Sequence, residues 1–185
     1  MEHSNQEIGE NLRTAFDLVR ETHRQVEVFL NALDEIGSDT IFENLTPGFF
    51  MRYNSDKNRW GWLYSSFVKV FKGNDPKILF SIEINFDRAY EVPVVIYGAH
   101  QYSAEAPQKC YPPNGWIFMH RKDKNWGFEI EEKDLGIYES RPLNNAKKEH
   151  TDLEWFRFKV IPLLDIERAN IKENIFENFL SCLPE

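Results

Sequence analysis

Apolar residues recur at helical spacing from about Gln6 to Ile36, which predicts a long amphipathic helix at the start of the chain. Gly37 and Ser38 supply a stop. The apolar stripe is wide enough to cover a sheet, so we expect the helix to pack within the molecule, with a coiled-coil seam as the alternative. The stripe consists of one seven-residue series (Leu12, Val19, Val26 and Leu33), a second series (Ala15, Thr22, Phe29 and Ile36), and Ile8, Phe16 and Leu30.

Alternating apolar and polar positions predict a sheet over about residues 59–161. In the clearest run, Ile78, Phe80, Ile82, Ile84 and Phe86 alternate with residues that we expect to be mostly exposed to solvent. These residues are Leu79, Ser81, Glu83, Asn85 and Asp87. The expected strands are residues 59–72 with a bend near 65–66, 78–87, 92–102, 115–121, 126–132 and 153–161, of which the fourth and fifth form a hairpin about residues 122–125.

A second helix is expected over about residues 165–183, capped by Asp165 and preceded by Pro162, where the last strand must end. The connections are short, as in antiparallel pairing. The fold class is therefore predicted as α+β, with a single mostly antiparallel sheet of about five or six strands flanked by long N-terminal and C-terminal helices, in one domain over residues 1–185. The stripe of the second helix is Ile166, Ala169, Phe176, Phe179, Leu180 and Leu183.

The composition fits a packed globular chain that needs no disulfides, metal or cofactor. Hydrophobic residues make up 42% and charged residues 28% of the 185 residues. The two cysteines, Cys110 and Cys182, lie far apart and have no metal-ligand spacing, which favours a reducing compartment. No leader-like start and no long apolar run is present, so we expect a cytoplasmic protein without a membrane partner.

The net charge of −8 is unevenly distributed, because residues 1–45 contain ten acids and only three bases. Residues 46–149 are close to neutral, with 13 acids and 15 bases. Broad nucleic-acid binding needs a clustered basic face, and this distribution argues against it.

One short pattern suggests metal-dependent catalysis. Asp123 precedes Glu131 and Lys133, and carboxylates beside a lysine on adjacent strands can hold Mg²⁺ and orient a water. The pattern resembles the Asp…Glu-x-Lys core of the PD-(D/E)xK nuclease superfamily, and that resemblance implies a metal-dependent phosphodiesterase site. The alternative is a solvated strand end, and the missing phosphate-loop, zinc-protease and serine-hydrolase motifs favour a non-catalytic role.

Two histidines on expected strands are candidates for a pocket. His100 and His120, with Tyr102 and Glu83, can line such a pocket as acids or bases. The alternative is that these histidines are hydrogen-bonded parts of a sheet face.

Four tryptophans lie near strand starts or hairpin ends: Trp60, Trp62, Trp116 and Trp126. If exposed, they form a stacking platform for a ligand; if buried, they are core. The neighbouring bases suit an acidic ligand or partner. These bases are Arg59, Arg121, Lys122 and Lys124.

The leading hypothesis from the sequence is a non-catalytic binding or regulatory module that meets another macromolecule, most simply a protein, through its aromatic-rich sheet face or hairpin. A metal-dependent nuclease-like enzyme and a small-ligand-binding domain with an aromatic pocket are the alternatives. A homodimer through the N-terminal helix is a third possibility.

Overall fold

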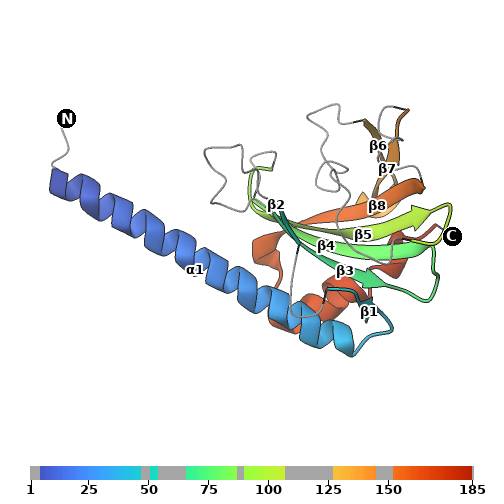
Figure 1. The fold of residues 1–185 in the computed structure, drawn as a ribbon, viewed down its shortest axis with the longest axis horizontal. Coiled ribbons are helices and arrows are strands. Elements are labelled where there is room, and N and C mark those ends of the chain that lie inside the picture. Colours follow the sequence, from blue (N-terminus) through green and yellow to red (C-terminus); the bar gives the residue numbers. More distant parts are fainter. Residues whose placement is uncertain are drawn as a thin grey trace.

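A computed structural model of the chain describes residues 5–46, 51–53, 66–86, 90–106, 127–144 and 152–184. It shows a twisted antiparallel sheet with helix α1 (Asn5–Ser38) lying across one side and extending past the sheet edge (Figure 1). The strand order is β1-β3-β4-β5-β8-β7-β6, and β2 also pairs with β3. The strands are β1 (Glu43–Asn44), β2 (Met51–Tyr53), β3 (Ser66–Lys72), β4 (Ile78–Asn85), β5 (Val94–Tyr102), β6 (Phe128–Glu132), β7 (Tyr138–Pro142) and β8 (Leu153–Pro162). The predicted α+β class is confirmed, and the described residues form eight strands where about five or six were expected.

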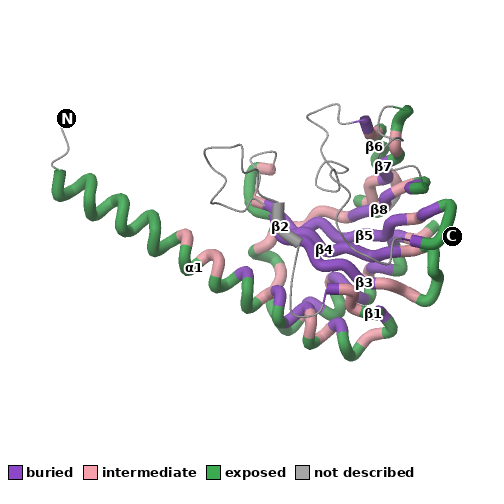
Figure 2. Tube along the Cα trace, viewed as in Figure 1, coloured by how far each residue is buried: buried purple, intermediate pink, exposed green. Residues whose placement is uncertain are grey.

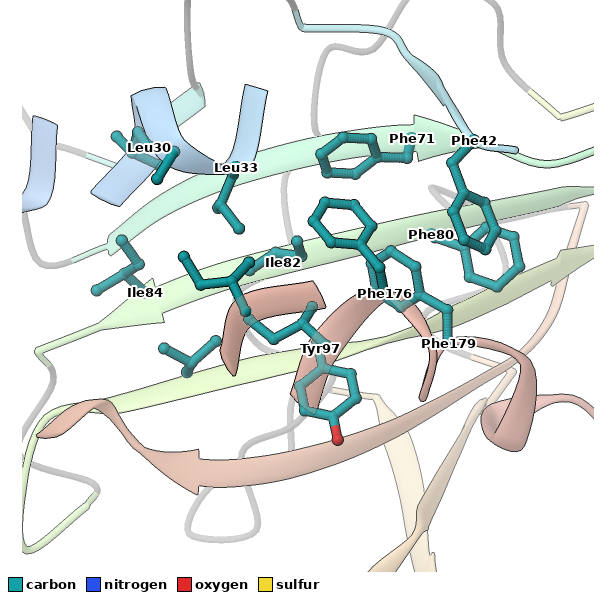
Figure 3. Close-up of a cluster of buried hydrophobic side chains, with 14 of the residues drawn as sticks. Leu30, Leu33, Phe42, Phe71, Phe80, Ile82, Ile84, Tyr97, Phe176 and Phe179 are labelled. Atoms are coloured by element: carbon teal, nitrogen blue, oxygen red, sulfur yellow. The ribbon is translucent and has the colours of Figure 1, made fainter. Parts of the chain in front are cut away.

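The first face of the sheet carries the larger aromatic core. Alternate residues of β3, β4 and β5 point to this face, and the register places Phe71 opposite Phe80 and Ile82 opposite Tyr97. Phe176 and Phe179 from the C-terminal segment pack against these rings, as Figure 3 shows together with Leu30 and Leu33 of α1. The predicted alternation of β4 therefore reports its core-facing residues correctly.

The second face is also buried, which contradicts the expectation of a mostly wet surface. Ser81, Glu83 and Asn85 of β4 are each no more than 5% exposed. They lie beside a second apolar cluster that draws on β3, β5 and β8, so the polar positions of β4 are polar groups inside the protein. In place of water, Ser81 pairs with His100 and Asn85 donates to Glu83. The buried members of this cluster are Val68, Val70, Leu79, Val94, Ile96, Tyr102, Ala106, Leu153, Phe156 and Phe158.

Helix α1 is confirmed nearly to the predicted ends, but only its second part packs on the sheet (Figure 2). We call residues 23–38 the docked half, in which Val26, Leu30 and Leu33 are buried. Residues 5–22, the projecting half, are exposed except for partly covered Val19 and Thr22. The prediction that the whole stripe packs within the molecule is therefore wrong for the projecting half, because the sheet is shorter than the helix, which at ~1.5 Å per residue is about 51 Å long.

A buried ion pair fastens the docked half to the sheet. Lys69 of β3 is 1% exposed, and its Nζ donates to both carboxylate oxygens of Asp34 at 2.7 and 2.8 Å and to the Thr46 carbonyl at 2.9 Å. Asn44 donates to the same carboxylate at 2.6 Å. Burial lowers the pKa of Lys69, although the hydrogen bonds to Asp34 and the Asp34 charge oppose that shift.

The predicted C-terminal helix over residues 165–183 is replaced by short helical turns. Asn170 accepts from the Glu167 amide at 2.9 Å in a capping box, so a new turn starts at Arg168. Further on, the Asn178 side chain donates to the Glu173 carbonyl at 3.0 Å. Leu180, predicted to face inward, is 52% exposed, and Cys182 is buried in its place. The turns are 3₁₀ segments Leu163–Asp165, Arg168–Asn170 and Leu180–Cys182, and a π segment Lys172–Phe176.

The sheet ends in a hairpin that the sequence did not predict. Strand β6 pairs with β7 across a turn in which Leu135 has φ 60° and Gly136 has φ 70°. Strand β7 is not among the strands expected from the sequence, since its run from Tyr138 has little apolar alternation. The expected strand 115–121 lies outside the described residues.

Strands β5 and β8 approach closely at Gly98. A Cβ built on Gly98 lies 2.0 Å from the Arg157 carbonyl oxygen and 2.7 Å from the Phe158 Cα. Only glycine fits this position without moving the backbone of β8.

Candidate functional site

A row of polar side chains crosses the buried second face, and we call Ser81, Glu83, Asn85 and His100 the polar row. His100 is 1% exposed, and its Nε2 lies 2.7 Å from the Ser81 hydroxyl. Strand β4 supplies three of the four residues because its alternate positions point to this face. The row therefore places a hydroxyl–imidazole pair and a carboxylate within an apolar layer.

Aromatic rings form a stack beside this row. His100 lies parallel to Phe156, with ring centroids 4.1 Å apart and planes 9° apart. Phe156 stacks on Phe158 at 4.9 Å, and Phe158 stacks on Tyr138 of β7 at 5.5 Å. The stack fixes the plane of the His100 ring and keeps its Nε2 directed at Ser81.

The structure does not pair His100 with Glu83, as an acid–base pocket would require. Asn85 donates to Glu83 at 2.7 Å. Leu79 is opposite His100, and Glu83 is four residues further along β4, which corresponds to about 13 Å at the usual rise of a strand. The carboxylate and the imidazole therefore have separate partners.

The other predicted pocket residues divide into buried and undescribed ones. Tyr102 is 5% exposed on the same face as His100. The remaining ligand-binding candidates lie outside the described residues, so the stacking-platform and small-ligand hypotheses stay predictions. These candidates are Trp60, Trp62, Trp116, Trp126 and His120.

The candidate catalytic residues Glu131 and Lys133 lie together at the outer end of β6. Their side chains form an ion pair of 2.5 Å, and the Glu131 side chain is 68% exposed. Asp123 lies outside the described residues. Among the residues that the structure describes, no group of three or more His, Cys, Asp and Glu side chains is placed to hold a metal ion. The nuclease hypothesis stays a prediction.

Sequence reasoning missed a buried carboxylate between β7 and β8. Glu139 is 2% exposed and accepts from Arg157 at 2.5 Å and from Arg141 at 2.6 Å. Burial alone would raise the pKa of Glu139, but the two arginines outweigh burial and hold this pKa below its usual value. Because β7 has little alternation, the sequence carries no signal that Glu139 faces inward.

Replacing Glu139 by glutamine should lower the unfolding free energy at pH 7 by about 2 kcal/mol, because the buried charged hydrogen bonds are weakened. A carboxyl whose folded pKa is depressed stabilises the protein above its unfolded value of 4.5, and this stabilisation is lost as the pH falls through the folded pKa. Urea unfolding between pH 3 and 7 should therefore show the two proteins converging in acid. Exposed Glu131→Gln is the control, and a Glu139→Gln deficit that stays constant with pH would contradict the assignment.

A second candidate surface is the apolar side of the projecting half of α1. Its large residues Ile8, Leu12, Phe16 and Leu18 are 46%, 58%, 61% and 69% exposed. They continue the stripe that is buried in the docked half, so one helix face is core at one end and surface at the other (Figure 2). Surface patches of this kind mark interaction sites more often than chance exposure.

Several charged residues on the other side of α1 pair with one another within the helix. Arg24 contacts Glu21 at 2.7 Å and Arg20 contacts Asp17 at 3.0 Å. Hydrogen bonds from Arg24 and Gln25 lower the pKa of Glu21 to about 2. The charged residues therefore lie on one side of the helix, and the opposite side is uncharged.

The two surfaces differ in what they offer. The polar row is buried, and Ser81 pairs with His100 and Asn85 with Glu83 inside it, whereas the projecting helix face is apolar and exposed. No helix in the described part of the chain combines the length and apolarity needed to cross a bilayer. The chain matches no protein-family model, no curated protein and no solved structure, so the functional argument rests on this geometry.

Proposed function

We propose that the protein is a non-catalytic binding module in which the sheet core holds α1 as a projecting arm for a macromolecular partner. The single observation that carries the proposal is the continuity of the α1 stripe. Val26, Leu30 and Leu33 are buried on the sheet, and the same face runs on to the exposed Ile8 and Leu12. A stripe that extends past its own core is suited to a second apolar surface.

In this proposal the binding surface is the projecting half of α1, and not the sheet face that the sequence suggested. Both faces of the central strands β4 and β5 are buried, since their residues are covered at nearly every position. The docked half anchors the arm through the Lys69–Asp34 pair and through Arg168, which contacts Glu35. A rigid anchor holds the arm in one orientation and reduces the entropy lost on binding.

Site-specific photo-crosslinking from two positions of α1 tests the proposal. A benzophenone side chain at Leu12 lies on the uncharged face, and the same group at Val28, which is 47% exposed, lies on the opposite side of the helix. We expect a discrete covalent adduct from position 12 in cells, identified by mass spectrometry, and none from position 28.

Both outcomes of the crosslinking are informative. An adduct from position 12 that contains either this chain or one other protein supports a binding arm. Equal labelling from both positions, or no adduct from either, would contradict it. Thermal unfolding of both labelled proteins checks that the benzophenone leaves the fold intact.

A further inference from the structure

We infer that the partner of the arm is a second copy of this chain, bound through an antiparallel pair of projecting halves related by a two-fold axis. The inference rests on the proposed function and adds the identity and register of the partner. It follows from the uncharged face of the helix and from the position of the sheet core along α1.

The projecting half has one wide face without charge. Successive helical residues are about 100° apart, so Ile8, Leu12, Ala15 and Val19 lie on one line, with Leu18 and Phe16 on its two sides. All charged residues from Asn5 to Arg24 lie outside this face. They are Glu7, Glu10, Arg13, Asp17, Arg20, Glu21 and Arg24. A face this wide with charges only on the far side is typical of a helix packed against another helix.

The sheet core allows only an antiparallel pair. The His23 ring lies 5.9 Å from Phe67 of β3, and from this level onward the sheet occupies the same face of the helix. In a parallel pair both sheets would compete for the space between the two helices from this level onward. In an antiparallel pair, Asn5 of each helix lies level with Thr22 of the other, so neither helix extends along the part of the face that the other sheet occupies.

This register brings apolar residues of the two copies together. Ile8 lies opposite Val19 of the second copy, and Leu12 lies opposite Ala15 of the second copy. A large residue faces a smaller one in the second layer, and the two-fold axis repeats each contact. The surface is therefore complementary to itself.

Charge and area are compatible with a dimer. From Asn5 to Arg24 the helix has four acids and three bases, so the arms are almost neutral although the whole chain carries −8. Joining the two faces would remove on the order of 1,000 Å² from water, which reaches the lower end of specific interfaces. We expect a dissociation constant of roughly 10 µM, since an interface of this size lies at the weak end of the range.

Analytical ultracentrifugation of the full chain over a concentration series tests the dimer. We expect a reversible monomer–dimer equilibrium that Leu12→Glu weakens by at least ~100-fold, because the two-fold axis places two buried charges in one interface. Val28→Glu makes the same change on the opposite side of the helix and should leave the equilibrium unchanged.

Cysteine crosslinking tests the register in a Cys110→Ser background, with Cys182 buried and its pKa raised to about 11 by burial. The register places position 8 of one copy opposite position 19 of the other, and a disulfide requires Cα atoms within about 7 Å. The double variant Ile8→Cys with Val19→Cys should therefore form a disulfide-linked dimer. Each single variant should form none. Dimers from the single variants would show a parallel pair and overturn the register.

The outcomes separate this inference from the proposed function. A chain that remains monomeric at 1 mM, or is equally affected by Leu12→Glu and Val28→Glu, overturns the second copy as the partner. If the position-12 photo-adduct then contains a different protein, the binding arm stands and its partner is that protein. If no adduct forms either, both proposals fail.

Discussion

Gly98→Ala is expected to reduce the unfolding free energy by about 4 kcal/mol or to prevent folding, because the new methyl group meets main-chain atoms. A Cβ at this position would lie 2.0 Å from the Arg157 carbonyl oxygen, and backbone atoms have no alternative rotamer. Strand β8 must therefore shift away from β5, at the centre of the sheet. Circular dichroism during urea unfolding measures the loss.

Gly9→Ala is the matched control for this prediction. The substitution is the same, but a Cβ at Gly9 would have no atom within 4 Å beyond its chain neighbours and the backbone of its own helix. Alanine is favoured over glycine inside a helix by up to about 1 kcal/mol, so this variant should be as stable as the parent or slightly more stable. Similar losses in both variants would mean that the close approach of β5 and β8 is absent.

Asp34→Ala should cost about 3 kcal/mol of unfolding free energy, because it leaves the Lys69 ammonium buried without its counter-charge. Lys69 Nζ loses the Asp34 carboxylate and keeps the Thr46 carbonyl, and the Asn44 amide loses its acceptor. The docked half of α1 is fixed to β3 through this pair, so the loss should appear in helix content and sheet content together. Guanidinium unfolding followed by both signals measures it.

A double variant separates the cost of an uncompensated charge from the value of the ion pair. Asp34→Ala with Lys69→Met removes both charges and fills the lysine site with an apolar chain, which in other buried pairs restores stability. We expect the double variant to recover most of the loss. A double variant no more stable than Asp34→Ala would show that packing around Asp34, and not the charge, holds the helix.

The strands and the first helix could be predicted because burial there follows one period. The alternation of Ile78, Phe80, Ile82 and Ile84 matches β4, and the stop at Gly37 matches the end of α1. Alternation reports which side chains share a face, but it does not report what covers the other face. Glu83 therefore looked like a surface residue and is buried with Asn85 as its partner.

The remaining differences have local causes. The C-terminal segment has an apolar stripe, yet a capping box of Glu167 and Asn170 starts a separate turn within it, and the Asn178 side chain bonds to the Glu173 carbonyl. Strand β7 has a polar pattern because its inward residue is a carboxylate, Glu139, which pairs with Arg141 and Arg157. For the candidate site, the helical period revealed the stripe of α1, but nothing in the sequence shows that the sheet ends near His23.

The aromatic core on the first face also has a consequence for the order of folding. Its layers come from distant parts of the chain, since Phe42 contacts Phe176 and Phe179 (Figure 3). During synthesis, β3, β4 and β5 are complete long before residues 171–182 leave the ribosome. Until then a sheet lined with phenylalanine lacks part of its cover, which is the kind of surface that nascent chains aggregate through and chaperones bind. Closure by the last segment is a long-range step, so it should make the final stage of folding slow.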